Sequence, residues 1–266
     1  MSRGLPKWNE RTTITNTLKK YHKRKDHKSY FVYGPKGSGK STWSILSSYS
    51  FYKDWDKVFK YMVFSRQELL NIIRECFDFE NKRVIKRIPV LIWDDATFEN
   101  IRTQSQDAFI EEFSKFYTLV RSVVSNFIWT SPNFTLLPSK LKSMDWVLVR
   151  ISRINEPSSK AHFYMYNQMP NGRIYLKSYR VGDRKIEETY YLGWLPKTTR
   201  ERYEIIRDGY SIDGFLQLEK AYKLQEKQKF NTRKIVDNLS KRLKYQMSKD
   251  DVPITAIVKK SNKKSK

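Results

Sequence analysis

Short runs of apolar and aromatic residues recur between residues 30 and 151, and amphipathic stretches separate them. Runs of about four to eight apolar residues are typical of buried strands, whereas apolar positions that return every three or four residues are typical of helices. The runs predict strands over residues 30–33, 58–65, 90–93, 126–130 and 146–151. The amphipathic stretches predict helices over residues 15–21, 41–51, 67–77, 103–124 and 136–144. This alternation predicts an α/β fold around a mostly parallel, doubly wound sheet.

The pattern changes near residue 162. Residues 163–168 and 173–179 flank Asn171-Gly172, which predicts a β-hairpin with a tight turn. One face of its second strand combines basic and aromatic side chains, those of Arg173, Tyr175, Lys177 and Tyr179. Such a face suits phosphates and stacked bases, or it packs its tyrosines on the domain while its cations face water.

The last part of the chain is mostly helical by pattern. Residues 187–194 predict one more strand, and amphipathic stretches predict helices over residues 196–208, 213–230 and 232–247. We therefore divide the chain into a basic N-terminal arm at 1–27, a main domain at 28–212 that includes the hairpin at about 162–179, and a basic helical extension at 213–266. The lysine-rich end of that extension is expected to be disordered.

A glycine-rich loop carries the strongest chemical signal. It follows a predicted strand, opens a predicted helix and has the spacing G-x-x-x-x-G-K-[ST]. Glycines let backbone N–H groups converge on an anion, and the helix N-terminus adds partial positive charge there. The expected cradle for ATP consists of Gly34, Pro35, Lys36, Gly37, Ser38, Gly39, Lys40, Ser41 and Thr42. Lys40 is expected to reach the terminal phosphates, and the Ser41 hydroxyl to bind Mg²⁺.

Residues 90–95 read Val-Leu-Ile-Trp-Asp-Asp. Apolar residues that end in acid predict a buried parallel strand whose carboxyl end emerges at a site, a Walker B pattern. We expect Asp94 to hold the Mg²⁺ shell and Asp95 to orient and deprotonate the attacking water.

The next predicted strand ends in polar residues that could sense the terminal phosphate. Thr130, Ser131 and Asn133 are the candidates. Thr130 lies closest to the end of the strand, and Asn133 offers the best hydrogen-bond donor. We keep Thr130 and Asn133 as the expected catalytic partners of Lys40 and Asp95.

The composition of the chain predicts a partner and argues against several classes of protein. The chain of 266 residues has 52 Lys and Arg against 28 Asp and Glu, a formal charge of +24. An excess of this size predicts a polyanionic partner, DNA first and an anionic membrane surface second. A run of 18 apolar residues and an N-terminal apolar signal segment are both missing, so we expect a cytoplasmic protein without membrane insertion. One cysteine and three histidines exclude an internal disulfide and a zinc site.

A cluster of cations precedes the first predicted strand. It consists of Lys19, Lys20, Lys23, Arg24, Lys25 and Lys28. The cluster either contacts phosphates or forms a solvated, flexible arm.

With these residues in hand, the chain resembles small P-loop ATPases of archaeal viruses and plasmids, some of them described as DnaA-like or AAA+-like. The likeness rests on residues 34–41, on Trp93-Asp94-Asp95-Ala96, on residues 116–121 and 128–132, and on the later Leu195-Pro196 with Tyr203 and Arg207. An extra strand between the P-loop helix and the acidic strand is the layout of additional-strand ATPases of the AAA+ and RecA kind. The resemblance implies ATP hydrolysis coupled to work on DNA, in replication or maintenance of a mobile element.

Two departures from that family bear on mechanism. Most AAA+ proteins have Glu where this chain has Asp95, one methylene shorter, which favours a slow switch over a motor. A homo-oligomer is compatible with the resemblance, although Lys140 and Lys142 rather than an arginine precede the fifth predicted strand.

Three functions follow from this pattern. The first is an ATP-dependent DNA-binding protein that hydrolyses ATP. The second is a motor that threads DNA for packaging or conjugation, which predicts a hexamer with DNA-stimulated hydrolysis. The third is a structural DNA-binding protein that ATP gates with little cleavage.

Overall fold

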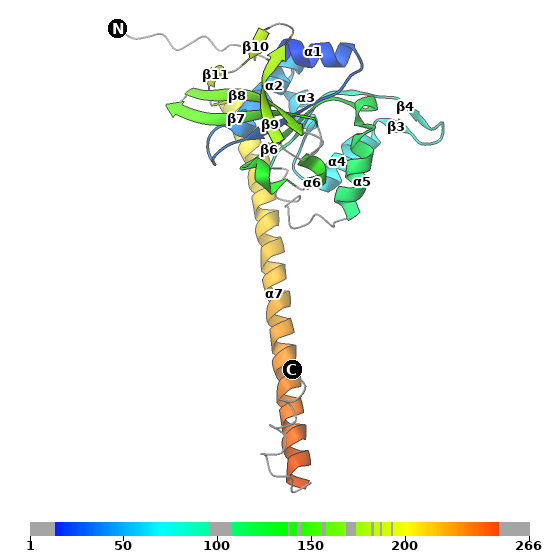
Figure 1. Ribbon diagram of the computed structural model, residues 1–266, viewed down its shortest axis with the longest axis vertical. Coiled ribbons are helices and arrows are strands. Elements are labelled where there is room, and N and C mark those ends of the chain that lie inside the picture. The colour runs from blue at the N-terminus through cyan, green and yellow to red at the C-terminus, as the bar shows by residue number, and fades with distance from the viewer. Residues whose placement is uncertain are drawn as a thin grey trace. The chain divides into compact units, whose positions relative to one another are not determined.

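The computed structural model describes residues 14–95, 108–137, 139–142, 145–155, 158–168, 174–181, 184–186, 188–192 and 194–249. The chain divides into two compact units between Arg202 and Tyr203. The first unit holds the β-sheet and helices α1 to α6, and the second consists of the greater part of helix α7 (Figure 1).

The helices are α1 (Thr15–Lys23), α2 (Lys40–Tyr52), α3 (Trp55–Lys60), α4 (Arg66–Arg74), α5 (Ala108–Tyr117), α6 (Ser139–Lys142) and α7 (Lys197–Lys249), with 3₁₀ turns η2 (Val120–Ser122) and η3 (Phe134–Leu136). The strands are β1 (Lys28–Tyr33), β2 (Met62–Val63), β3 (Phe77–Asp78), β4 (Arg83–Val84), β5 (Ile88–Trp93), β6 (Val124–Ser131), β7 (Trp146–Asn155), β8 (Ser158–Gln168), β9 (Ile174–Val181), β10 (Arg184–Ile186) and β11 (Glu188–Leu192).

The main sheet has a parallel centre and an antiparallel extension. Its strand order is β10-β9-β8-β7-β1-β6-β5-β2, and β11 pairs with β8. Strands β7, β1, β6, β5 and β2 run parallel to one another, whereas β8 to β11 pair antiparallel. This confirms the predicted α/β fold with a parallel central sheet. Strand β6 lies between β1 and β5, so the loop after β1 and the acids after β5 flank the end of β6.

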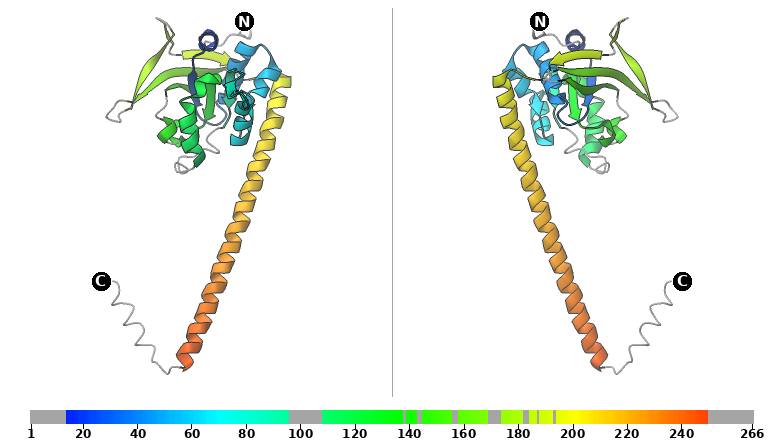
Figure 2. Two further views of the ribbon diagram at one scale, coloured as in Figure 1. Left: turned by 90° about the vertical axis from the view of Figure 1, so that its right-hand side faces the viewer. Right: turned by 90° about the vertical axis from the view of Figure 1, so that its left-hand side faces the viewer.

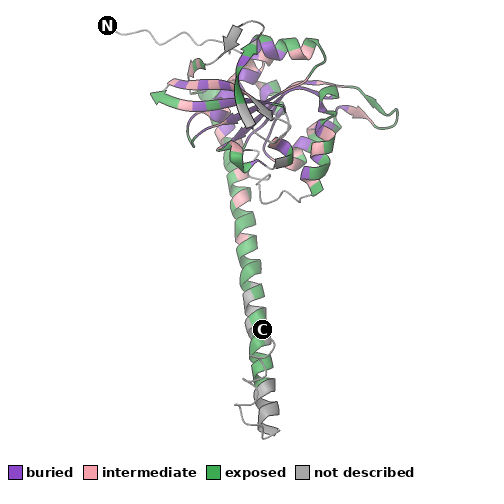
Figure 3. Ribbon diagram, in the orientation of Figure 1, coloured by how far each residue is buried: buried purple, intermediate pink, exposed green. Residues whose placement is uncertain are grey.

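Helices cover both faces of the parallel centre. Side chains alternate along each strand, so Phe31, Trp93 and Trp129 face a core formed with α4, α5 and α6. On the opposite face α1 and α2 pack against β5 and β6, and the buried Asn126 amide donates to the Leu18 carbonyl of α1. The burial pattern in Figure 3 shows these strands as the most continuously buried part of the chain.

The second predicted strand, residues 58–65, is wrong over most of its length. Asp54 caps α3 by accepting hydrogen bonds from the backbone N–H groups of Asp56 and Lys57, so Val58 and Phe59 bury one face of a helix instead. Only Met62–Val63 joins the sheet, and Ser65 already caps α4 through a capping box with Glu68. A short apolar run does not distinguish a buried strand from a buried helix.

Other predictions need smaller corrections. The helix predicted at 67–77 is α4, in which Leu69 and Ile73 are buried whereas Leu70 is 46% exposed. Residues 83–84 form the short strand β4, which pairs with β3 in a second, two-stranded sheet that the sequence did not predict. The helix predicted at 103–124 is observed as α5 and η2, and residues 96–107 lie outside the described part of the chain.

The predicted hairpin is observed as β8 and β9, with its turn at residues 169–173 outside the described residues. Tyr179 is buried and stacks against Phe163, so this tyrosine of the basic and aromatic face packs on the domain. Lys177 is exposed. The strand predicted at 187–194 is β11.

The N-terminal cation cluster belongs largely to a packed helix. The helix predicted at 15–21 is observed as α1, and Leu18 is fully buried together with Ile14 just before it. The cluster therefore lies on the solvent side of a fixed element: Lys19, Lys20, Lys23, Arg24 and Lys25 are exposed. Residues 1–13 lie outside the described part of the chain.

The C-terminal region forms one helix where we predicted three. Helix α7 has 53 residues and runs without a break through Gly209 and Thr232 (Figure 2). A single glycine costs only about 1 kcal/mol inside a helix. Ser211 and Thr232 donate their hydroxyls back to the carbonyls of Arg207 and Gln228, which keeps both polar residues compatible with the helix. The tail expected to be disordered, residues 250–266, lies outside the described residues.

Candidate functional site

Three neighbouring strands end at the candidate site. The glycine-rich loop follows β1, Asp94 and Asp95 follow β5, and Thr130 lies near the end of β6 between them. Because the three strands are parallel, their carboxyl ends meet at one edge of the sheet. Ligands of open α/β sheets bind at this edge.

The glycine-rich loop has the backbone conformations that its glycines allow. Gly34, Gly37 and Gly39 have φ angles of 154°, 74° and 94°. A Cβ atom on Gly34 would lie 2.3 Å from the Ile151 carbonyl oxygen of β7, so a side chain there would displace the loop or the strand. The Gly34 N–H donates to the Pro132 carbonyl, which ties the loop to the segment after β6.

The remaining loop residues divide by exposure. Pro35 and Lys36 are exposed at the crest of the loop, whereas Ser38 is buried. Gly39 is the N-cap of α2, and Thr42 is partly buried in the first turn of that helix.

The buried Lys40 side chain turns back onto the loop. Its Nζ donates to the Gly34 carbonyl at 3.1 Å and to the Pro35 carbonyl at 2.9 Å. Burial lowers the pKa of Lys40, and the carboxylates of Asp95 and Asp94 oppose that shift. The ammonium group thus lies between the loop and both acids.

Asp94 joins the loop to the neighbouring strand. Its carboxylate is fully buried, and its Oδ1 accepts a hydrogen bond from Ser41 Oγ at 2.9 Å and another from Thr130 Oγ1 at 2.5 Å. The structure therefore brings together the two residues that we expected to bind Mg²⁺, Ser41 and Asp94, and adds Thr130 to them.

Asp95 has a backbone conformation that is uncommon outside glycine. Its φ angle is 49°, and its N–H donates to Thr130 Oγ1 at 2.8 Å. Residues held in this left-handed region concentrate at functional sites. Since Asp94 is buried and Asp95 is exposed, the two adjacent acids have different environments.

Asn133 does not join this cluster. It is exposed, and its Oδ1 accepts from the Thr135 N–H as the N-cap of η3. Ser131 donates to the Asn133 carbonyl and accepts from its N–H. Capping uses the side-chain oxygen of Asn133 and not its amide donor, so the expectation that Asn133 acts beside Thr130 stays a prediction.

Sequence reasoning missed two side chains that contact the loop. Ser159 of β8 donates to the Ser38 carbonyl at 3.2 Å, and Tyr191 of β11 donates to the Gly39 carbonyl at 3.0 Å. Both residues lie more than 100 positions after the loop in the sequence. Their strands show no motif, so only the antiparallel pairing of β8 and β11 reveals them.

The residues present fit a magnesium–triphosphate group. The first-turn N–H groups of a helix lack intrahelical partners, and a Cβ atom on Gly37 would meet nothing within 4 Å, so the crest of the loop is open. The buried Ser38 hydroxyl makes no hydrogen bond among the described residues. Ser41 and Asp94 offer the oxygen ligands that Mg²⁺ prefers. In the described part of the chain no three His, Cys, Asp or Glu side chains gather into a metal cage, and Mg²⁺ bound with phosphates and water needs none.

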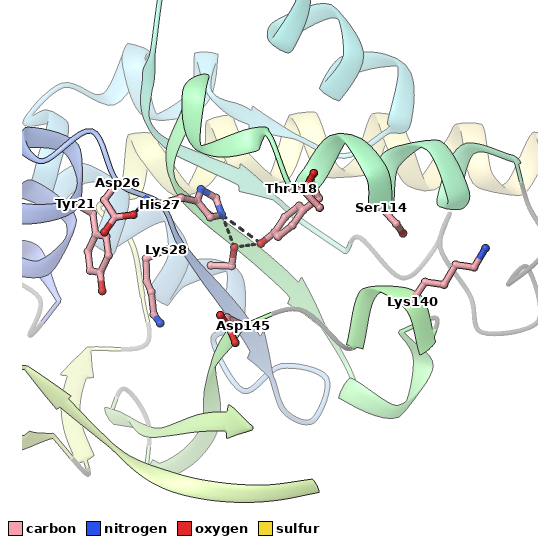
Figure 4. Close-up of a pocket in the computed structure, with 10 residues that line it drawn as sticks. Tyr21, Asp26, His27, Lys28, Ser114, Thr118, Lys140 and Asp145 are labelled. Carbon is pink, nitrogen blue, oxygen red and sulfur yellow. Dashed lines mark hydrogen bonds between the residues drawn. The ribbon is translucent and has the colours of Figure 1, made fainter. Parts of the chain in front are cut away.

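A cavity of about 720 Å³ lies at the other end of β1, lined partly by His27, Lys28 and Ser29. Hydrogen bonds join His27, Ser29 and Tyr117 at its lining, and Figure 4 shows His27 there with dashed lines to its partners. The His27 Nδ1 also bonds the Val124 carbonyl at 2.8 Å. These polar groups satisfy one another, so the glycine-rich loop remains the candidate site.

The chain was compared with known proteins. No family model matches it. It is 26% identical to the uncharacterized protein B-251 of Sulfolobus spindle-shape virus 1 over 160 residues, which cover 56% of this chain and 61% of that protein. The chain thus matches less than two thirds of this relative's own length.

Proposed function

We propose that the chain is a Mg²⁺-dependent ATPase of the additional-strand P-loop class that works on DNA. One observation carries the proposal: the buried Asp94 carboxylate accepts hydrogen bonds from both Ser41 of the glycine-rich loop and Thr130 of β6. These two hydrogen bonds join the glycine-rich loop, an acid and the polar end of β6, which supports the proposal. Ordinary strand-loop-helix packing does not require a buried carboxylate at that point.

Each residue has a role in hydrolysis under this proposal. The N–H groups from Gly37 to Ser41 bind the phosphates, and the Lys40 ammonium exchanges the carbonyls of Gly34 and Pro35 for phosphate oxygens. Ser41 and Asp94 hold Mg²⁺, which when bound draws negative charge from the phosphoryl group.

Water activation falls to Asp95. Its exposed carboxylate accepts a proton from the attacking water, while the Thr130 hydroxyl, fixed between Asp94 and the Asp95 N–H, keeps the acid pair in place. Thr130 is therefore a positioning residue in this account, and Asn133 has no part in it.

Charge supports DNA as the partner. The formal charge of +24 is far above what the acidic residues offset, and exposed cations occur on α1 and on β9. None of the described helices is both long and apolar enough to cross a bilayer. One relative belongs to a virus, which supports a place in virus or plasmid replication or maintenance.

Single-turnover hydrolysis of ATP, with and without duplex or single-stranded DNA, tests the proposal. Wild-type protein should cleave ATP only with Mg²⁺. Lys40→Ala should lose ATP binding, and Asp95→Asn should bind ATP with turnover reduced by about 10²-fold or more. Undiminished turnover in Asp95→Asn would contradict the assignment of Asp95 as the general base. Absence of ATP cleavage by the wild type would contradict the proposed ATPase activity.

A further inference from the structure

Two side chains from the antiparallel extension contact consecutive carbonyls of the glycine-rich loop. Ser159 Oγ donates to the carbonyl of Ser38, and Tyr191 OH donates to the carbonyl of Gly39. Ser159 is buried and Tyr191 is partly buried. These are the last two peptide groups before the helix α2, where a bound anion would meet the helix N-terminus.

The two donors form one unit. Ser159 and Tyr191 lie directly opposite each other in the antiparallel pairing of β8 with β11, so both side chains leave the same face of the sheet. The next residue along β11, Tyr190, points to the other face; it is 67% exposed, and the Lys160 ammonium lies over its ring. Adjacent tyrosines of one strand therefore differ in whether they contact the loop.

Peptide geometry turns these contacts into a constraint on the anion donors. The C=O and N–H of a trans peptide point in opposite directions. A hydrogen bond that fixes the Ser38 carbonyl also fixes the Gly39 N–H. The Gly39 carbonyl accepts from the Trp43 N–H of α2 at 2.9 Å and from Tyr191 as a second donor, and both bonds help to fix the Lys40 N–H. Both N–H groups belong to the proposed phosphate cradle.

We infer that Ser159 and Tyr191 are positioning residues for phosphate binding, which hold the Gly39 and Lys40 N–H groups toward the nucleotide before it arrives. This inference rests on the proposed nucleotide-binding function. Donors that are fixed in advance lose less conformational freedom on binding, so the hydroxyls raise affinity without touching the ligand.

The surroundings of the loop agree with this role. Gly34, at the other end of the loop, packs against the Ile151 carbonyl of β7, the strand that pairs with β8. Strands β7, β8 and β11 thus contact the loop at three points. Burial raises the pKa of Tyr191, so its hydroxyl stays protonated and keeps donating at neutral and mildly alkaline pH.

Equilibrium binding of ADP with Mg²⁺ and of inorganic pyrophosphate, measured by calorimetry on the full chain, tests the inference. Tyr191→Phe and Ser159→Ala each remove one hydroxyl and should each weaken both ligands by about three- to tenfold. The loss should be equal for the two ligands because the N–H groups contact phosphate and not the base. Tyr190→Phe is the matched control and should bind both ligands as the wild type does.

Thermal unfolding of the ligand-free variants shows whether the two hydroxyls position the phosphate-binding N–H groups or only stabilise the fold. If Tyr191→Phe and Ser159→Ala lower the unfolding temperature yet bind both ligands as tightly as the wild type, the inference is overturned while the proposed function stands. Equal weakening in Tyr190→Phe would also overturn it. Failure of the wild type to bind either ligand would instead overturn the proposed function itself.

Discussion

Replacing Gly34 by alanine should destabilise the glycine-rich loop more than the same replacement at Gly37. The added Cβ would lie 2.3 Å from the Ile151 carbonyl oxygen and 3.1 Å from Ser38 Oγ. The first distance is far inside van der Waals contact, and the oxygen belongs to the backbone of β7, which pairs with β1 and β8 on either side. Neither the loop nor the strand can move without loss of hydrogen bonds.

The expected loss of stability in Gly34→Ala is the sum of two free-energy costs, one steric and one conformational. Forcing an extra methyl group into a packed site costs about 1–3 kcal/mol. The Gly34 φ of 154° is a conformation that side-chain-bearing residues avoid, at about 1–3 kcal/mol more. We therefore expect Gly34→Ala to lower the free energy of unfolding by about 2–6 kcal/mol.

Gly37→Ala is the matched control. Gly37 also has a positive φ, 74°, but a Cβ there would meet no atom within 4 Å. Gly37→Ala should therefore lower the free energy of unfolding only by the cost of its backbone conformation, about 1–2 kcal/mol.

Urea unfolding of the wild type and both variants measures the two costs. The difference between Gly34→Ala and Gly37→Ala should be at least about 1 kcal/mol, with Gly34→Ala the less stable. Equal stability of the two variants would refute the close approach of the loop to β7, and with it the geometry from which the site is argued.

Further predictions concern the strand end and the distant histidine. Thr130→Val keeps the shape of the side chain but removes one hydrogen-bond donor from the Asp94 carboxylate, which keeps Ser41, and removes the acceptor of the Asp95 N–H, so we expect a loss of about 2–4 kcal/mol in urea unfolding and at least tenfold slower turnover. Asn133→Ala should remove only a cap, at about 1 kcal/mol, with turnover unchanged; slower turnover in this variant alone would favour Asn133 over Thr130. Burial lowers the pKa of His27 to about 4 from 6.5, so the unfolded chain binds more protons in this window and stability should fall by up to about 3 kcal/mol as the pH is lowered through it. His27→Gln should flatten that part of the stability profile, and an unchanged profile would contradict the buried, neutral histidine.

Local signals in the sequence were sufficient to predict the positions of the glycine-rich loop and of the strand that ends in Asp94. The loop spacing, the apolar run before Asp94 and the polar end at Thr130 are each contained within a few residues, and parallel pairing brings their ends together. The cap that Asn133 forms was not predictable from its position after the strand: a turn directs its side-chain oxygen to the Thr135 N–H, and its catalytic role stays a prediction.

Features that depend on distant contacts were not predictable. The run at residues 58–65 has strand composition, yet the cap from Asp54 and the burial of Val58 select a helix for its first part. Ser159 and Tyr191 carry no local pattern, and only the pairing of β8 with β11 brings them to the loop. Helix α7 is continuous where we predicted three helices, and the Ser211 and Thr232 hydroxyls donate to carbonyls four residues earlier within it.

The central claim is that the loop from Gly34 to Thr42 binds a nucleoside triphosphate, and direct titration with a fluorescent ATP analogue in the presence of Mg²⁺ tests it most simply. We predict saturable one-to-one binding that inorganic pyrophosphate displaces and that Lys40→Ala abolishes, with Lys57→Ala, at an exposed lysine of α3 outside the loop, as the control that retains binding. Absence of saturable binding to the wild type, or equal affinity in Lys40→Ala, would contradict the account.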